Sequence, residues 1–452
     1  MGPGGLPSLQ NCAGVGDPGT GGFDSHAPSP GHPMGNAAPS VRVIAAARRK
    51  RPPRPERRAG PPFAANPGAD RRMTALPLPH QIGDEEAADL TAHLVAIRSY
   101  PGEEGPVQRA VANWLRAQGL PAELQPTEGD RPNVVSRVEN GPGPTFLLNG
   151  HTDTVLAAEG WETDPWTPTR VGDRLYGLGA CDMKSGVAAA MLATRELARH
   201  RDRWRGTLLF ASVVDEEAYS VGARALIAGG LAADACLVTE ASWDWPCLGS
   251  IGKVLVRVTV TGRAAHAVWP EQGVNAAIEA AKFVAALDSV PLGTHPRMTA
   301  SQTVLSFLSG SAQYVMTIPE TAVVQVNRMI VPGETADSVV AELRALADRL
   351  GSPARFDFRV DPPYYPPWET SPDAPLALAL ADAYREEAGA APAWAYTGFG
   401  DMNLFSTEAG IPTVMAGPRG ANFHQANEWV EVPSIAATAR LAIRLVESRL
   451  GA

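Results

Sequence analysis

Three apolar runs in this chain end abruptly in residues that can bind a metal ion, and this pattern limits the fold more than any other feature. The runs and the residues that follow them are Thr207–Val214 with Glu216 and Glu217, Phe146–Asn149 with His151 and Asp153, and Ala235–Thr239 with Glu240. Adjacent carboxylates at the tip of an apolar strand repel each other unless a positive charge lies between them. In an open α/β sheet, the carboxyl ends of the strands meet at one edge. We therefore expect a metal site at that edge.

The order of the predicted elements indicates an α/β sheet with an insertion. Between residues 144 and 240, strands alternate with helical stretches at 185–198 and 221–228, as in βαβ units with a mainly parallel sheet. From about residue 251 the pattern changes to strict alternation, with valines at 254, 256, 258 and 260. A helix at 275–287, a strand at 321–330 and a helix at 336–350 complete an α+β block.

The proline-rich segment 361–368 is expected to end this block, because neither a helix nor a central strand accommodates its prolines. A helix at 375–388 and a strand at 413–416 then rejoin the first sheet. We predict two parts of one catalytic domain, at 76–250 and 363–452, separated by an inserted α+β lid at 251–362.

The first 75 residues are rich in Gly, Pro, Ala and Arg without strand or helix periodicity, so we expect a disordered extension and a translation start at Met73. Residues 1–72 carry ten Lys and Arg against four Asp and Glu, a net of +6, which leaves −15 for the remainder of a chain of net charge −9. An acidic body argues against a nucleic-acid partner.

The four cysteines include no CxxC pair, which favours a reducing compartment. No apolar run approaches the ~20 residues of a membrane span, and the apolar stretch at 43–47 is too short for a signal peptide. We predict a cytoplasmic protein without a membrane partner.

Further candidates for the metal site lie in two loops. Asp182 follows a glycine-rich turn before the helix at 185, where it can cap the helix, bind a metal ion, or do both. The thiol of Cys181 is a weaker candidate, because its neighbour already offers a carboxylate. His424, in a polar loop after a strand, is a second imidazole. Glu216 and Glu217 point in different directions on an extended backbone, so one can bind metal while the other acts as a base.

The complete set holds two imidazoles and three carboxylates for metal, with one spare glutamate. Mixed nitrogen and oxygen donors suit catalytic zinc, or cobalt or manganese, rather than a structural zinc. Two ions bridged by one carboxylate would use the whole set.

With these residues the chain resembles the M20 metallopeptidase family, the group of acetylornithine deacetylase, succinyl-diaminopimelate desuccinylase, aminoacylase-1 and glutamate carboxypeptidase. The resemblance covers about residues 84–450 and rests on HTDTV at 151, YGLGACDMKSG at 176, DEE at 215, VTE at 238 and FHQANE at 423. It implies that Asp182 bridges two zinc ions. It also implies the remaining roles: His151 and Glu240 at one ion, Glu217 and His424 at the other, Glu216 as general base, and Asp153 as support for His151.

The same resemblance implies a zinc-aminopeptidase-like α/β domain interrupted by a ferredoxin-like lid that forms a homodimer. His266 resembles the family's lid histidine, which polarises the scissile carbonyl in the partner's site. Arg328 resembles the lid arginine that binds a substrate carboxylate, and Asn275 and Gly417 are further expected substrate-binding residues. The chain departs from many relatives at Thr317, where they have Asn, so the substrate does not carry over.

The predicted reaction is hydrolysis of the amide bond of an N-acyl amino acid, with a dipeptidase or carboxypeptidase as the first alternative and a non-catalytic binding protein of the same fold as the second. A serine hydrolase is disfavoured, since no GxSxG occurs. The segment 249–253 does not have the spacing of a phosphate-binding loop.

Overall fold

The structure is a computed structural model that describes residues 82–451. The chain divides into two units, Met1–Ala75 and Leu76–Ala452, and all described residues belong to the second. The predicted extension at 1–75 and the predicted start at Met73 lie outside the described residues.

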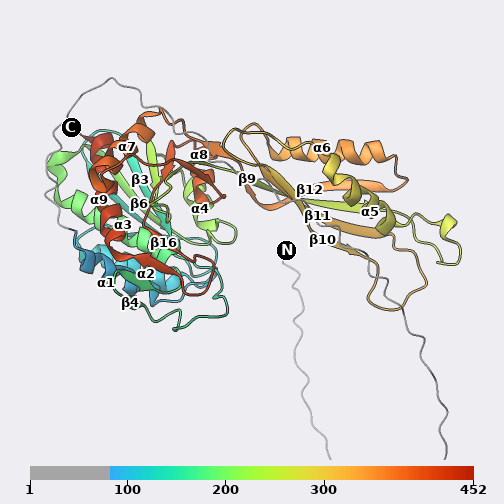
Figure 1. Ribbon diagram of the computed structural model, residues 1–452, viewed down its shortest axis with the longest axis horizontal. Helices are drawn as coiled ribbons and strands as arrows, with labels where there is room; N and C mark the ends of the chain where they lie inside the picture. The colour runs from blue at the N-terminus through green and yellow to red at the C-terminus, as the bar shows by residue number, and fades with distance from the viewer. Residues whose placement is uncertain (1–81, 452) are drawn as a thin grey trace, which may run out of the picture. The chain divides into compact units, whose positions relative to one another are not determined.

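A nine-stranded mixed sheet forms the larger part of the second unit (Figure 1). Its strand order is β1-β2-β6-β3-β7-β15-β8-β13, with β14 beside β8. The central strands are parallel: β3 (Thr145–His151) pairs in parallel with both β6 (Gly206–Val213) and β7 (Ala235–Val238), and β7 pairs in parallel with β15 (Thr413–Met415). The outer strands are mostly antiparallel: β1 (Glu123–Gln125), β2 (Asn133–Asn140), β8 (Cys247–Ser250) and β13 (Trp368–Glu369), while β14 (Ala395–Thr397) is parallel to β8. The predicted mainly parallel sheet is therefore right for the strands that carry the site.

Helices cover both faces of this sheet, which explains why its central strands are apolar throughout. Phe146 and Leu148 of β3 belong to a hydrophobic cluster with α1 (Asp84–Val95), α2 (Gly105–Ala117), α3 (Ser185–Arg199), α7 (Pro375–Ala388) and α9 (Val432–Leu450). Leu147, between them, belongs to a second cluster with α4 (Val221–Ala228) and α8 (Asp401–Thr407). Successive side chains of a strand point to opposite faces, so β3 is buried on both.

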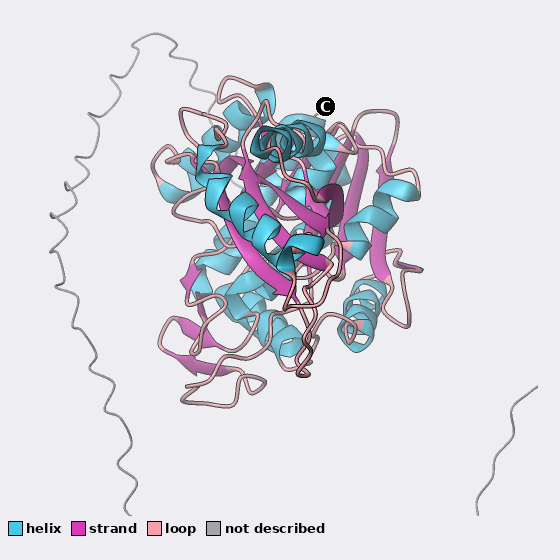
Figure 2. Ribbon diagram, turned by 90° about the vertical axis from the view of Figure 1, so that its right-hand side faces the viewer, coloured by secondary structure: helices cyan, strands magenta, loops and turns pink. Residues whose placement is uncertain are grey.

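A second, four-stranded antiparallel sheet is built from the predicted α+β block. Its order is β10-β11-β9-β12, with β9 (Gly252–Thr261), β10 (Ser301–Ser309), β11 (Thr321–Ile330) and β12 (Arg355–Tyr365). The alternating valines of β9 are fully buried, and helices α5 (Ala276–Ala286) and α6 (Ala336–Leu350) pack against the strands (Figures 1 and 2). The prediction of a period-two strand at this point is confirmed.

The proline-rich segment 361–368 was expected to end the α+β block, and the last strand of that block extends into it. Pro362 and Pro363 lie inside β12, which runs to Tyr365. Strand β12 is an edge strand, and its pairing with β9 shifts register between Asp361 and Tyr365. Proline is tolerated at such a place, since it needs no ladder hydrogen bond there.

A third sheet, made of very short strands, brings two distant loops together. It pairs β16 (Gly420–Ala421) with β17 (Trp429–Glu431), β17 with β5 (Arg174–Tyr176), and β5 with β4 (Thr169–Val171). The loop after β5 carries Asp182, and the loop between β16 and β17 carries His424. Within residues 82–451, no helix is both long and apolar enough to cross a membrane.

Candidate metal centre

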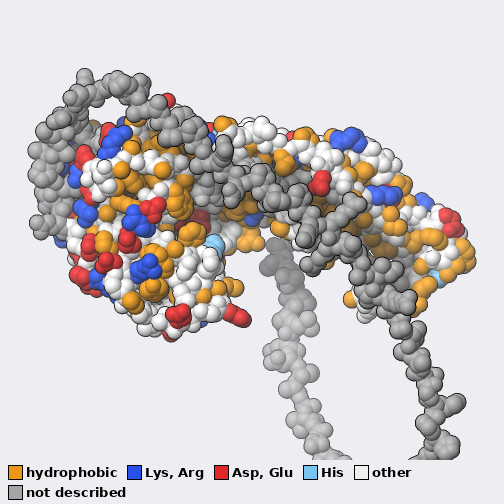
Figure 3. All heavy atoms as spheres, in the orientation of Figure 1, with side chains coloured by type: hydrophobic (Ala, Val, Ile, Leu, Met, Phe, Trp, Pro, Cys, Tyr) orange, Lys and Arg blue, Asp and Glu red, His pale blue; other side chains and the backbone are white. Residues whose placement is uncertain are grey.

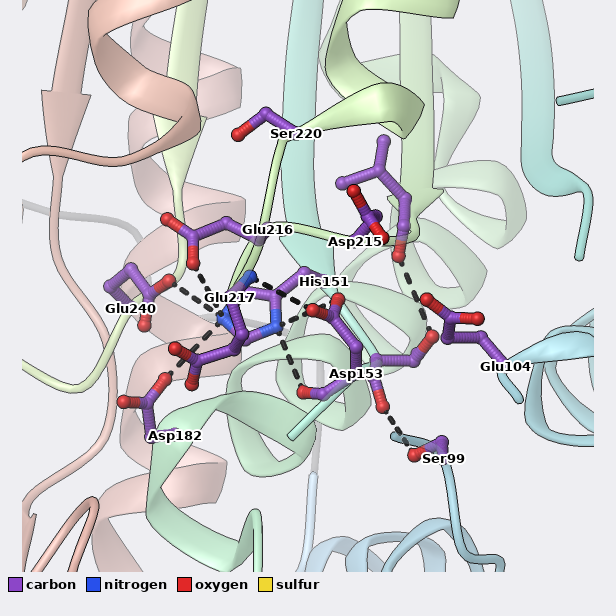
Figure 4. Close-up of polar contacts among 12 residues, drawn as sticks. Ser99, Glu104, His151, Asp153, Asp182, Asp215, Glu216, Glu217, Ser220 and Glu240 are labelled. Carbon is purple, nitrogen blue, oxygen red and sulfur yellow. Dashed lines mark hydrogen bonds and ion pairs between the residues drawn. The ribbon is translucent and has the colours of Figure 1, made fainter. Parts of the chain in front are cut away.

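The predicted ligands converge on the carboxyl edge of the large sheet. His151 is the last residue of β3, Glu216 and Glu217 follow β6, and Glu240 follows β7 (Figure 4). The Nε2 atom of His151 lies 3.1 Å from Oε1 of Glu240 and 3.3 Å from Oδ1 of Asp182. His151 is 1% exposed, and its buried Nε2 has no hydrogen-bond partner among the described residues.

Asp182 faces an imidazole with each of its two oxygens. Its Oδ1 is directed to His151, while its Oδ2 lies 3.2 Å from Nε2 of His424. The same nitrogen of His424 lies 3.1 Å from Oε1 of Glu217. Ligand atoms of His151, Asp182 and Glu217 all lie within 4.8 Å of one another. Asp182 does not cap α3, whose N-cap residue is Lys184.

The raised pKa values of the histidines and glutamates in this cluster indicate an excess of negative charge. Burial alone would lower the pKa of His151, but Glu240 and Asp153 raise it well above its usual value. Hydrogen bonds with Asp182 and Glu217 raise the pKa of His424 to about 10. Burial, and then the charge of Asp182, raises the pKa of Glu240 to about 7 and also raises that of Glu217. A pair of divalent cations would supply the missing charge, and the donors are those that such cations bind.

Asp153 orients the imidazole of His151. Its backbone oxygen lies 3.1 Å, and its Oδ1 atom 3.4 Å, from Nδ1 of His151, which turns Nε2 towards Asp182 and Glu240. Its Oδ2 accepts a hydrogen bond of 2.9 Å from the backbone N–H of Glu217. Asp153 thus connects the end of β3 with the loop after β6, as ligand-supporting carboxylates do in metal sites.

Glu428 is a buried carboxylate whose contribution the sequence did not reveal. Its Oε1 accepts hydrogen bonds from the backbone N–H groups of Cys181 at 2.7 Å and Asp182 at 2.9 Å, and its Oε2 accepts one from Gly179 at 2.8 Å. Burial raises the pKa of Glu428 to about 8. Its position in the FHQANE motif was the available signal, but only the structure shows that it fixes the turn of Asp182.

A cavity of about 160 Å³ opens beside the cluster. Its lining combines polar and apolar side chains: those of Asp182, Glu216, Glu217, Glu240 and His424, and those of Trp245, Phe399, Met402, Met415 and Phe423. The carboxylate of Glu216 is 13% exposed, with Oε2 3.9 Å from Nε2 of His151. Burial raises the pKa of Glu216 well above its usual value. This side chain can therefore accept and release a proton at the edge of the donor cluster.

Other predicted site residues lie outside the cluster. His266 is exposed on a loop of the α+β block, where its backbone forms an isolated antiparallel β-bridge with that of Thr317. Asn275 caps α5 through its side-chain oxygen. Arg328 is fully buried and donates hydrogen bonds to Glu334, Glu342, Gln302 and the carbonyl of Pro291.

Gly417 and Cys181 lie near the cluster without offering a ligand. A side chain at Gly417 would collide with the backbone oxygens of Thr239 and Glu240, so this glycine permits close packing behind Glu240. Cys181 is buried, and burial raises its thiol pKa well above the usual value, which disfavours the thiolate that zinc requires.

Comparison with known proteins agrees with this geometry. Residues 147–448 match the family model described as peptidase family M20/M25/M40. The succinyl-diaminopimelate desuccinylase of Methylobacterium radiotolerans is 30% identical over 379 residues, which cover 80% of this chain and 95% of the relative.

Solved structures share the fold. Aminopeptidase PepT from Bacillus cereus gives a TM-score of 0.67 at 23% identity, covering 81% of this chain and 99% of its own. A dinuclear metal binding peptidase of the M20 family from Bacillus subtilis gives 0.64 at 16% identity, covering 81% and 98%.

The fold, the donor cluster and these matches define a metal-dependent hydrolase of amide bonds. The chain belongs to peptidase family M20/M25/M40, so the expected family and the expectation of an enzyme are confirmed.

Proposed function

We propose that this enzyme is a di-zinc amidohydrolase that cleaves the amide bond of an N-acyl amino acid. The observation that carries the proposal is the placement of Asp182, whose Oδ1 faces His151 and whose Oδ2 faces His424. The succinyl-diaminopimelate desuccinylase relatives support the substrate class, since a desuccinylase removes an acyl group from its substrate.

The residues divide into two ligand sets that share Asp182. His151 and Glu240 would hold one ion, and Glu217 and His424 the other, with zinc preferred and cobalt or manganese as alternatives. When bound, such ions supply Lewis-acid activation of the attacking water and of the amide carbonyl. Asp153 keeps Nε2 of His151 directed at the first set.

Glu216 is the proposed general base and acid. It takes the proton of the attacking water on a carboxylate oxygen and returns it to the leaving amine nitrogen, so no proton is lost or gained overall. Its raised pKa suits both steps, since a catalytic group works best when its pKa lies near the working pH.

The α+β block at 251–362 is the proposed lid and dimerisation domain, set between catalytic parts at 76–250 and 363–452. His266, Asn275, Arg328 and Gly417 remain the proposed substrate-binding set, with the partner's copy of the lid histidine polarising the carbonyl. We also propose a homodimer, and the cytoplasm as its location on the strength of the cysteine pattern.

A peptidase acting on dipeptides or on carboxyl-terminal residues is the second candidate. It is favoured by the fold shared with PepT and with an M20 family metallo-carboxypeptidase from Sulfolobus solfataricus, which gives a TM-score of 0.65 at 17% identity. Both candidates use the same proposed centre and differ only in the substrate.

The deciding experiment measures metal content and hydrolysis together. Purified protein loaded with zinc or cobalt is assayed on N-acetyl and N-succinyl amino acids and on a dipeptide panel. We expect two ions per chain and a higher kcat/KM for acylated amino acids. Preference for dipeptides would select the peptidase, and a single ion per chain would reject the di-zinc proposal.

A further inference from the structure

The carboxylate of Glu216 packs directly against the backbone of Gly400, just before α8. A Cβ atom at position 400 would lie far below 3.0 Å from Oε1 of Glu216, and 2.8 Å from Sδ of Met402. The backbone of Gly400 is extended, with φ −177° and ψ −161°, which any residue can adopt. Position 400 therefore needs a glycine to leave space for Glu216, and not because of its backbone conformation.

Gly398, two residues earlier in the same loop, makes a useful contrast. A Cβ atom at position 398 would have no other atom within 4 Å, and this glycine has no positive φ. The two glycines thus share a loop and differ in whether a methyl group meets Glu216.

The backbone of Gly400 is fixed by the side chain of Asn403, which is fully buried. Oδ1 of Asn403 accepts hydrogen bonds from the Gly400 N–H at 3.0 Å and from Oγ of Ser250 at 2.8 Å. Its Nδ2 donates to the carbonyl oxygens of Ile251 at 3.0 Å and Pro366 at 2.7 Å. All four hydrogen-bonding positions of this amide are therefore used.

The two carbonyls lie in the connections between the two sheets. Ile251 lies between β8 and β9, and Pro366 lies between β12 and β13. Each therefore belongs to a connection between the nine-stranded sheet and the β10-β11-β9-β12 sheet. One amide side chain thus ties both connections to the loop against which Glu216 packs.

We propose that Gly400 and Asn403 are positioning residues for the general base. Gly400 leaves the space that the Glu216 carboxylate occupies, and Asn403 fixes the backbone of Gly400 relative to both connections to the β10-β11-β9-β12 sheet. The inference rests on the proposed role of Glu216. The two atoms closer than 3.0 Å, Oε1 of Glu216 and Sδ of Met402, both belong to rotatable side chains, so a methyl group at 400 is accommodated by moving these side chains, with the fold intact. A misplacement of about 1 Å in a reacting group can cost about 100-fold in rate.

The test compares Gly400→Ala with Gly398→Ala in the zinc-loaded enzyme. We expect Gly400→Ala to keep its metal content and its thermal midpoint near those of the native enzyme, while its kcat falls about 100-fold below that of Gly398→Ala. A methyl group at 398 meets the open cavity, so its effect on substrate appears in KM. Equal kcat values for the two variants would overturn the proposal.

A double-mutant cycle tests the contact itself. Glu216→Asp withdraws the carboxylate from position 400, so its effect on kcat is expected to be at least tenfold smaller in the Gly400→Ala background than in the native one. Independent, multiplicative losses would overturn the proposed contact.

Asn403→Asp keeps both acceptor positions of the side chain and removes the two donated hydrogen bonds. We expect lower kcat with unchanged metal content; a folded variant with native kcat removes Asn403 from the proposal. If this variant does not fold, Ser250→Ala, which deletes one bond to Oδ1, is measured in its place with the same two outcomes.

Glu216→Ala is assayed in parallel. An active Glu216→Ala rejects the proposed role of Glu216 as general base, whereas an inactive Glu216→Ala beside an active Gly400→Ala rejects only the positioning proposal.

Discussion

Glu216 and Glu217 are adjacent in the chain but have different surroundings. Glu217 faces His424 with its carboxylate, and its backbone N–H is held by Asp153. Both side chains line the cavity, but Oε2 of Glu216 lies 3.9 Å from Nε2 of His151, whereas Oε1 of Glu217 lies 3.1 Å from Nε2 of His424. The division of labour inferred from an extended backbone, one carboxylate for metal and one for proton transfer, is therefore compatible with the observed geometry.

Replacing Glu216 separates these two tasks. We expect Glu216→Ala to retain two bound ions and to lose about 10²–10⁴-fold in kcat, the usual contribution of a positioned acid–base group. Metal analysis and steady-state kinetics on the same preparation check this expectation. Near-native turnover would assign the proton transfer to another group.

Glu428 offers a test of the ligand-supporting network. Glu428→Gln exchanges one acceptor oxygen for an N–H group, which cannot accept the hydrogen bonds around Asp182. We expect metal affinity to fall about 10–100-fold, as for other residues that orient metal ligands.

Competition with a chromophoric chelator measures this affinity. Glu431→Gln is the control, because Glu431 lies in the neighbouring strand β17 and pairs with Arg419 instead. Equal affinities in the two variants would contradict the assigned role of Glu428.

At the scale of elements, residues at strand ends and strongly periodic helices could be predicted from the sequence. The helices expected at 221–228, 336–350 and 375–388 coincide with α4, α6 and α7. The strand-end residues meet because parallel strands share an edge, a rule of topology that needs no coordinates.

Other elements left too little pattern to be recognised. Helix α9 is buried along most of its length, so its polar stripe is narrow and consists mainly of Arg440, Arg444 and Glu447. Strand β16 has two residues, too few for alternation, yet with β17 it frames the loop of His424. Glu428 contacts backbone groups about 250 positions earlier, which no local pattern predicts.

The end of strand β12 should make the stability of the enzyme depend on acid pH. Burial alone would raise the pKa of Asp361, but hydrogen bonds from Arg359 at 2.9 Å and Arg257 at 2.7 Å hold it below the usual value. A lowered pKa means that this stabilisation is present above the unfolded value of about 4 and is lost as pH falls through the folded value.

We expect Asp361→Asn to lower the free energy of unfolding by about 1 kcal/mol at pH 7, with the difference shrinking below about pH 4. Urea unfolding across this pH range provides the measurement. Asp357→Asn, an exposed change on the same strand, serves as the control. A difference that persists unchanged at pH 3 would contradict the linkage.

At the scale of the whole molecule, the β10-β11-β9-β12 sheet has an exposed edge that suits association with a second copy of the chain. Leu305, Phe307 and Leu308 are exposed on β10, which is an edge strand. Figure 3 shows further hydrophobic side chains at scattered places on the right-hand part of the described surface. An unpaired edge with exposed apolar side chains is suited to association with an identical edge.

We expect the native protein to be a dimer and Leu308→Asp to shift it towards the monomer, because a carboxylate would lose its hydration in the interface. Light scattering after size-exclusion chromatography measures both. Leu378→Asp changes an equally apolar, exposed position on α7 and should leave the dimer intact. A native monomer would refute the predicted dimer.

The proposed centre also has a consequence for how the enzyme is made. Glu217 and the imidazole it faces are 207 residues apart, so the two can meet only after His424 has been synthesised. A nascent chain that has not yet reached His424 already carries every carboxylate of the cluster but only one of its two histidines. Hydrolytic activity should therefore be absent from a nascent or prematurely terminated chain that lacks this residue.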